Sequence, residues 1–285
     1  MEIQNMRNRV FHMAAVVLIL LAFSSFAISQ NKNEITEDLI KEQVNAVPCK
    51  NEERLEAAKK LFRDAGATDA DMEVQKFKDV NNLVVTKKGK TADTVIVSAH
   101  YDKVKEGCGA IDNWTGVVII SDLYRRMRSA ETNKTYLFVA FDKEEAGLLG
   151  SEAMAKAIPK ETRASYCSNI NLDSFGFSYP QVLDNSSSPK MTEMAKSVAD
   201  EVKMPFTHAS LEGVADADSS SFKSREIPAI TFHGLSNEWQ KYLHSSNDQV
   251  KNIKLSSVFV GYNFLLRYVV KIDGSDCGVF RKSGK

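Results

Sequence analysis

Apolar and polar positions alternate along the chain in blocks of two kinds. Four short, almost continuously apolar runs predict strands that are covered on both faces of a sheet: residues 94–99, 135–141, 168–172 and 228–232. Apolar residues recur at helical spacing between and after these runs, which predicts helices at residues 117–127, 148–157, 189–202 and 255–270. Strands that alternate with helices in this way favour a largely parallel sheet.

The region before the first apolar run has a different pattern. Helical spacing predicts two amphipathic helices, at residues 35–47 and 52–65, and two strands follow at residues 72–77 and 82–86. There is no internal repeat and no low-complexity linker. We therefore expect the α/β class, with one three-layer αβα domain built on a mixed, largely parallel sheet that has helices on both faces.

The first 29 residues have the three parts of a secretory signal peptide. Arg7 and Arg9 form a basic start, residues 13–27 are apolar, and small residues follow. The apolar run is short for a bilayer span of about 20 residues, although an uncleaved anchor is the alternative. We expect a signal peptide at residues 1–29, a mature domain at residues 30–285, and a secreted or periplasmic protein with no stable membrane anchor after cleavage.

Charge and cysteine content exclude several classes of protein. The chain has 37 Lys and Arg against 37 Asp and Glu, so it lacks the basic surface of a nucleic-acid-binding protein. Four cysteines, Cys49, Cys108, Cys167 and Cys277, lack the close spacing of a cysteine zinc site. In an exported chain one or two disulfides are expected, and the sequence leaves three connectivities open. A Cys49–Cys277 bond, which would join the ends of the domain, is one of them.

Side chains that can bind metals or move protons follow three of the predicted strands. His100 and Asp102 follow the first apolar run, Glu144 and Glu145 follow the second, and Asp173 follows the third. Ligands of open α/β sheets bind beyond the carboxyl ends of the strands. These five side chains are therefore expected at one edge of the sheet.

Two further candidates lie in loops. Asp112 lies in a glycine-rich turn that opens a helix, where it is either a helix cap or a carboxylate that bridges two metal ions. His244 lies in a polar loop before the last helix. His233 ends the fourth strand and is a candidate to contact substrate, whereas His208 is expected to be structural or at the surface.

The segments that hold these residues resemble the M28 family of zinc peptidases, and they occur in the order of that family: residues 100–102, 109–116, 141–151 and 171–173, then His244 with Asp248. The resemblance implies a zinc-peptidase fold. It also implies a catalytic site with two zinc ions per chain and peptide substrates. One departure is Ser219, which stands where the family usually has histidine.

The resemblance also implies a role for each residue of the site. His100 and Asp173 would hold one zinc ion, Glu145 and His244 the other, and Asp112 would bridge them. Glu144 would be the general base. Asp102 would hydrogen-bond the ring of His100, as carboxylates beside metal-bound histidines do.

Three functions remain in competition at this point. The first is a secreted aminopeptidase with two zinc ions, in which Glu144 takes a proton from a zinc-activated water. The second is a glutaminyl cyclase, which has a related fold and uses one zinc ion to cyclise an amino-terminal glutamine. The third is a non-catalytic binding protein, which predicts a broken ligand set. The intact ligand set favours the first.

Overall fold

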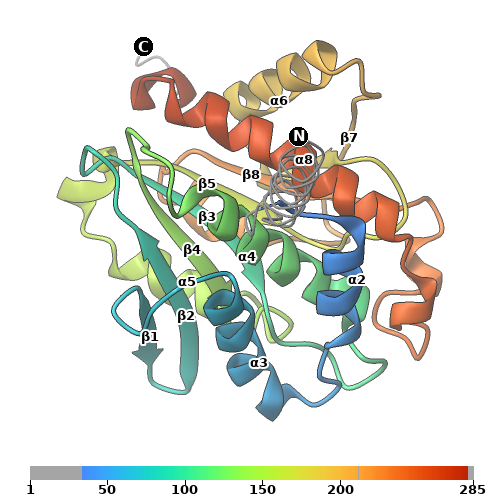
Figure 1. Cartoon of the computed structure of the whole chain (residues 1–285). Helices are drawn as coiled ribbons and strands as arrows, with labels where there is room; N and C mark the ends of the chain where they lie inside the picture. Colours follow the sequence, from blue (N-terminus) through green and yellow to red (C-terminus); the bar gives the residue numbers. More distant parts are fainter. Residues whose placement is uncertain (1–33, 211, 282–285) are drawn as a thin grey trace, which may run out of the picture. The chain divides into compact units, whose positions relative to one another are not determined.

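The computed structural model describes residues 34–210 and 212–281 of the chain. The predicted signal peptide at residues 1–29 therefore lies outside the described residues. Within them, one eight-stranded sheet has the order β1-β2-β4-β3-β5-β8-β6-β7 (Figure 1). Its strands are β1 (Met72–Phe77), β2 (Val80–Lys87), β3 (Thr94–His100), β4 (Thr135–Phe141), β5 (Tyr166–Leu172), β6 (Gln181–Leu183), β7 (Thr207–Ala209) and β8 (Ala229–His233).

The centre of the sheet is parallel and its flanks are mixed. β4, β3, β5 and β8 run parallel to one another. β2 pairs antiparallel with β4, and β6 pairs antiparallel with β8. This arrangement confirms the predicted mixed, largely parallel sheet. β6 and β7 were not predicted, because a strand of three residues is too short to show an alternating pattern.

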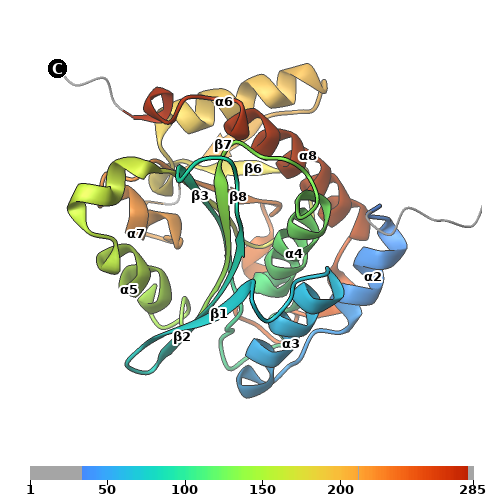
Figure 2. The same cartoon turned by 60° about the vertical axis from the view of Figure 1, so that its left-hand side comes forward.

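Helices cover both faces of the sheet (Figure 2). One face is covered by five helices, of which α2 packs on α4 and α8: α2 (Glu37–Asn45), α3 (Asn51–Asp64), α4 (Thr115–Met127), α6 (Pro189–Glu201) and α8 (Leu255–Asp273). The other face packs against α5 (Leu149–Ala157) and the short α7 (Ser219–Lys223), which was not predicted. The predicted three-layer αβα class is confirmed.

Alternation along the central strands fills the two cores. In β3, Val95 and Val97 face the layer with α4, whereas Ile96 faces the layer with α5. In β4, Phe138 and Val139 divide in the same way. A strand that buries both faces in this manner is continuously apolar. Its packing in two cores fixes the position of its last residue.

The C-terminal helix α8 is long and apolar enough to cross a membrane by length and composition alone. In the fold, half of the apolar stretch of this helix is buried, and the helix packs against α2, α4 and α6. Its apolar character is therefore accounted for by the core of the domain.

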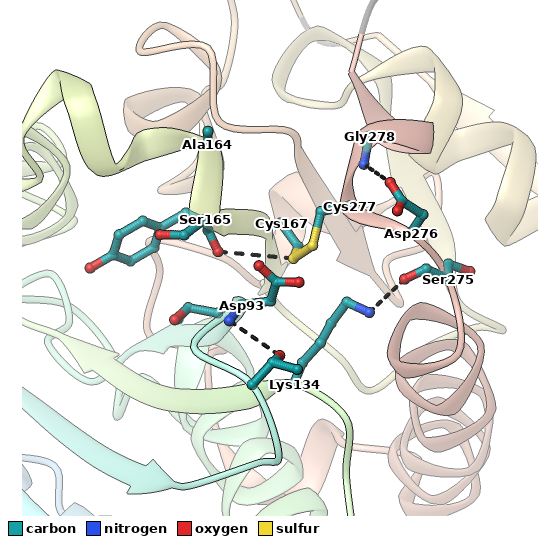
Figure 3. Close-up of a disulfide and its surroundings, with 12 residues drawn as sticks. Asp93, Lys134, Ala164, Ser165, Cys167, Ser275, Asp276, Cys277 and Gly278 are labelled. Carbon is teal, nitrogen blue, oxygen red and sulfur yellow. Dashed lines mark hydrogen bonds between the residues drawn. A yellow bond between two sulfur atoms is a disulfide. The ribbon is translucent and has the colours of Figure 1, made fainter.

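Two disulfides join the four cysteines of the described chain. Cys49 bonds Cys108, and Cys167 bonds Cys277. The Cys49–Cys277 pairing considered above is therefore wrong. Each end of the domain is instead tied to the neighbour it packs on: the turn after α2 to the loop after β3, and the segment after α8 to β5. Lys134 extends beside the second disulfide and donates a hydrogen bond to the carbonyl oxygen of Ser275 at 2.5 Å (Figure 3).

Candidate metal centre

Three neighbouring strands carry the acidic and histidine side chains to one edge of the sheet. β3 lies between β4 and β5, and all three run parallel. His100 is the last residue of β3, Glu144 and Glu145 follow β4, and Asp173 follows β5. The structure therefore brings together the residues that the strand pattern placed at this edge.

Asp112 reaches the same edge from a loop. It lies in a kinked turn, η1 (Ala110–Trp114), which begins after Gly109 and leads into α4, and its own backbone angles (φ −111°, ψ 93°) are not helical. Gly109 has a φ of 59°, and a Cβ there would lie 2.6 Å from the side chain of Lys103, so the turn requires glycine. The carboxylate of Asp248 accepts hydrogen bonds from the backbone N–H groups of Ile111 (2.7 Å) and Asp112 (3.3 Å) and so holds the turn in place.

The two carboxylate oxygens of Asp112 face two different histidines. Oδ1 lies 3.2 Å from Nε2 of His100, and Oδ2 lies 3.2 Å from Nε2 of His244. His100 Nε2 also lies 3.7 Å from Oδ1 of Asp173, and His244 Nε2 lies 3.0 Å from Oε2 of Glu145. The five predicted ligands therefore form two clusters of three that share Asp112.

The donor atoms of these clusters are of the kinds that bind zinc. In each cluster the imidazole nitrogen and carboxylate oxygens lie within 4.8 Å of one another. Imidazole nitrogens and carboxylate oxygens are common zinc ligands. His100 Nε2 and Glu145 Oε1 are buried and have no hydrogen-bond partner among the described residues. Buried polar atoms are normally paired, so these two atoms indicate a ligand that the protein itself does not supply.

Asp102 contacts two parts of the site. Its carboxylate accepts hydrogen bonds from the backbone N–H groups of Glu144 (2.9 Å) and Glu145 (3.1 Å). Nδ1 of His100 lies 3.2 Å from the backbone carbonyl oxygen of Asp102 and 3.5 Å from the carboxylate. Asp102 therefore positions the Glu144–Glu145 turn as well as the ring of His100.

The cluster concentrates negative charge in a buried place. Burial raises the pKa of Glu144 well above its usual value, and the nearby carboxylates of Asp218 and Asp173 add to this effect. Burial opposes protonation of His100, but the carboxylates around it outweigh burial and raise its pKa. Divalent cations are the groups that neutralise such a cluster most directly.

A cavity of about 250 Å³ opens beside the clusters. The carboxylates of Glu144, Glu145 and Asp173 line it, together with apolar side chains that include Leu183, Leu235, Trp239 and Leu243. His233 also lines this cavity. A cavity lined by both carboxylates and apolar side chains is typical of a small-molecule or peptide-end site.

The structure also shows the surroundings of His233, His208 and Ser219. Burial lowers the pKa of His233 to about 4. His208 is exposed, pairs with Asp184 at 2.6 Å and is not among the residues that line the cavity. The hydroxyl of Ser219 is buried and lies 2.6 Å from that of Thr231, so it is engaged within the protein.

Two residues of the site's surroundings were missed from the sequence. Arg54 on α3 is fully buried and donates to the carbonyl oxygens of Cys108 and Gly109, each at 3.0 Å. Asp218 is also fully buried, and neither of its carboxylate oxygens has a hydrogen-bond partner among the described residues. Burial raises the pKa of Asp218 to about 7. Arg54 lies in a charged amphipathic helix, where the sequence pattern does not distinguish a buried arginine from an exposed one.

Comparisons with known proteins identify relatives in sequence and in fold. The aminopeptidase YwaD of Bacillus subtilis is 29% identical over 185 residues, which cover 60% of this chain and 40% of that protein. The solved zinc aminopeptidase BSAP of Bacillus subtilis has a TM-score of 0.61 at 22% identity and covers 71% of this chain and 53% of that one. A glutaminyl cyclase of Fimbriiglobus ruber has a TM-score of 0.69 at 19% identity and covers 83% and 95%.

The extent of these matches differs between the relatives and the family model. The chain spans less than two thirds of the length of the two aminopeptidases named above. The model of peptidase family M28 matches residues 82–266, a region that runs from β2 into α8 and includes every residue of both clusters. This chain belongs to peptidase family M28.

Proposed function

We propose that this protein is an aminopeptidase that uses two zinc ions to hydrolyse the amino-terminal peptide bond of peptides. The observation that carries the proposal is the position of Asp112, whose two carboxylate oxygens each lie 3.2 Å from a different histidine nitrogen. A carboxylate shared in this way suits a pair of metal ions at short separation. Membership of a peptidase family and the aminopeptidase relatives support the same reaction.

His100 and Asp173 would hold one zinc ion, and Glu145 and His244 the other, with Asp112 between them. Zinc held by these residues would supply a Lewis acid for the scissile carbonyl and would lower the pKa of the attacking water from about 15.7 towards about 7. The apolar side of the cavity, with Trp239 and Leu243, would receive the first side chain of the peptide.

Glu144 is the proposed general base. It lines the cavity and would take the proton of the attacking water and return it to the leaving amine. Its carboxylate also lies close enough to His100 and Glu145 to act as a ligand. A Glu144→Gln variant separates the two roles, because a base is needed for turnover and a ligand is needed for metal.

A second candidate is cyclisation of an amino-terminal glutamine. It is supported by likeness in fold, because the solved glutaminyl cyclase of Fimbriiglobus ruber has a TM-score of 0.69 with this chain. The complete second cluster, Asp112 with Glu145 and His244, beside the first favours two metal ions and hence the peptidase.

The products separate the two reactions. The zinc-loaded protein would be given a panel of aminoacyl-coumarin substrates and a glutaminyl peptide, each with and without a chelator. We expect release of coumarin and of free amino acids that stops when the chelator is present. Release of ammonia from the glutaminyl peptide, with no cleavage of any free-amine substrate, would establish the cyclase instead.

Export is part of the proposal. The signal-peptide pattern of residues 1–29 supports it, and so do the two disulfides of the described chain, because such bonds persist in oxidising compartments. Expression of the whole chain followed by amino-terminal sequencing tests it. A protein that keeps Met1 and stays with the membrane would show an uncleaved anchor.

A further inference from the structure

His233 occupies a place in the cavity wall that the metal clusters do not explain. It ends β8, which pairs in parallel with β5 so that Phe232 lies beside Leu172. The backbone N–H of Asp173 donates to the carbonyl oxygen of Phe232 at 2.9 Å, so the pairing continues into the site. Because His233 follows Phe232 and Asp173 follows Leu172, His233 occupies the position at the end of β8 that corresponds to Asp173 after β5. Asp173 is a proposed zinc ligand.

The protonation of the His233 ring is fixed by its neighbour. The backbone N–H of Leu235 donates a hydrogen bond to Nδ1 of His233 at 3.3 Å. A backbone N–H is only a donor, so Nδ1 carries its lone pair, and the neutral ring carries its proton on Nε2. Among the described residues, no protein acceptor is paired with Nε2. The ring thus brings an uncommitted N–H donor to the cavity wall.

The backbone around His233 is held rigidly. The N–H of Gly234 donates to the carbonyl oxygen of Ser174 at 2.9 Å, and the N–H groups of Phe177 and Ser178 donate to the carbonyl oxygen of Gly234 at 2.9 Å and 3.0 Å. The segment that follows β8 is therefore bonded to the segment that follows Asp173. A donor on such a support keeps its direction during a reaction, which is the condition for stabilising charge that develops in a transition state.

We propose that His233 is a further catalytic residue, which donates a hydrogen bond from Nε2 to the carbonyl oxygen of the scissile peptide bond. The N–H group of Nε2 needs a hydrogen-bond acceptor as its partner. The positively charged amino terminus of the substrate is only a donor, so it cannot be that partner. The inference rests on the proposed peptidase function and adds a donor that belongs to the protein itself.

The bonds change as follows. The water oxygen forms a bond to the carbonyl carbon, the π electron pair moves to the carbonyl oxygen, and Glu144 receives the water's proton. An electron pair of the negatively charged oxygen then re-forms the C=O double bond as the carbon–nitrogen bond breaks. The electron pair of the broken bond stays on the leaving nitrogen, which takes the proton from Glu144. His233 keeps its proton throughout, and its hydrogen bond is strongest while the oxygen is negatively charged.

The tautomer can be read without metal or turnover. A long-range ¹H–¹⁵N correlation spectrum of the ¹⁵N-labelled, metal-free protein distinguishes the two ring nitrogens, and the signals that vanish in H233F identify the residue. We expect a proton on Nε2 and a bare Nδ1. A proton on Nδ1 overturns the inference, because Nε2 would then be an acceptor.

Kinetics of the zinc-loaded protein test the role. We expect H233F to lower kcat by ~10²–10³ with unchanged zinc content, as removal of one such donor does. H233Q, whose side-chain amide can present an N–H group, is expected to recover much of that loss. H208F is the matched control, because His208 is an exposed histidine outside the cavity, and it should keep wild-type kcat.

Three outcomes overturn the inference alone: H233F with near-wild-type kcat, H233Q no better than H233F, or loss of zinc from H233F, which would mean that His233 supports Asp173 rather than the substrate. Each presupposes an active wild-type protein. Wild-type protein that cleaves no free-amine substrate would overturn the proposed peptidase function itself and this inference with it.

Discussion

The guanidinium of Arg54 lies over the face of the Trp114 indole, with its central carbon 5.3 Å from the ring centroid. Both side chains are fully buried, and Trp114 ends the turn that holds Asp112. Arg54 also donates to the carbonyl oxygens of Pro48 (2.9 Å), Cys108 and Gly109. Burial lowers its pKa to about 10, so the group stays charged at neutral pH. One buried cation thus organises the backbone on which the Asp112 turn rests.

Replacement of Arg54 by methionine should destabilise the protein and weaken its metal site. The variant leaves several buried carbonyl oxygens without a donor, and we expect a loss of about 3–5 kcal/mol in the free energy of unfolding. Urea unfolding of metal-free protein and zinc titration measure the two effects. R63M is the control, because the exposed Arg63–Asp69 pair at 3.3 Å should contribute less than about 1 kcal/mol. Equal stability of the two variants would contradict the role given to Arg54.

Substitutions of the adjacent residues Glu144 and Glu145 should have different effects, one on turnover and the other on metal binding. We expect E144Q to keep its zinc and to lose ~10²–10⁴-fold in kcat, because the water's proton has no acceptor. E145A should lose zinc, because Oε2 of Glu145 is 3.0 Å from Nε2 of His244 and both belong to the same cluster. Metal analysis and kinetics on the same samples check this. Loss of zinc from E144Q would make Glu144 a ligand.

The two disulfides should differ in their effect on metal and agree in their effect on stability. They join residues 59 and 110 positions apart, for which chain entropy gives about 4 and about 5 kcal/mol. Cys108 directly precedes Gly109, which starts the Asp112 turn, whereas Cys167–Cys277 lies towards the other end of β5 from Asp173. We therefore expect C49A/C108A to lower zinc affinity and C167A/C277A to leave it unchanged. Calorimetry and zinc titration of both double variants decide this, and equal zinc affinities would contradict it.

Asp122 on α4 should make stability depend on pH away from the metal centre. It is fully buried and accepts a hydrogen bond from Gln43 at 2.8 Å, and burial raises its pKa to about 6. Arg125 and Tyr262 are the charged and titratable groups that act on it. A raised carboxyl pKa means that the folded state holds its proton more tightly than the unfolded state. The contribution of Asp122 to the free energy of unfolding is therefore complete below pH 4 and is lost as the pH rises through about 6.

D122N removes this titration. Relative to the variant, the wild-type protein should lose up to about 3 kcal/mol in the free energy of unfolding between pH 4 and pH 7. Urea unfolding of both proteins in chelator at several pH values measures the difference. Parallel pH profiles for the two proteins would show that Asp122 titrates alike in the folded and unfolded states.

The central strands and the residues that end them were predictable, because a strand buried on both faces is a continuous run of apolar residues in the sequence. β3, β4 and β5 are continuously apolar, and a polar residue such as His100 at the end of such a strand is conspicuous. The pairing of β6 with β8 was not predictable, since three residues carry no period. Arg54 and Asp218 were not predictable either, because their burial depends on contacts between distant segments. The disulfide pairing depends on the same kind of contact.

Asp248 determines how a single-metal form of this protein should be made. Its carboxylate receives the N–H groups of Ile111 and Asp112, and its carbonyl oxygen accepts from the N–H of Cys108 at 2.8 Å. A chain cut off before residue 244 would therefore lose His244 and would also release the turn that holds Asp112, the carboxylate that both clusters share. A gene designed to retain only the His100 ion should keep the chain at full length and change His244 alone.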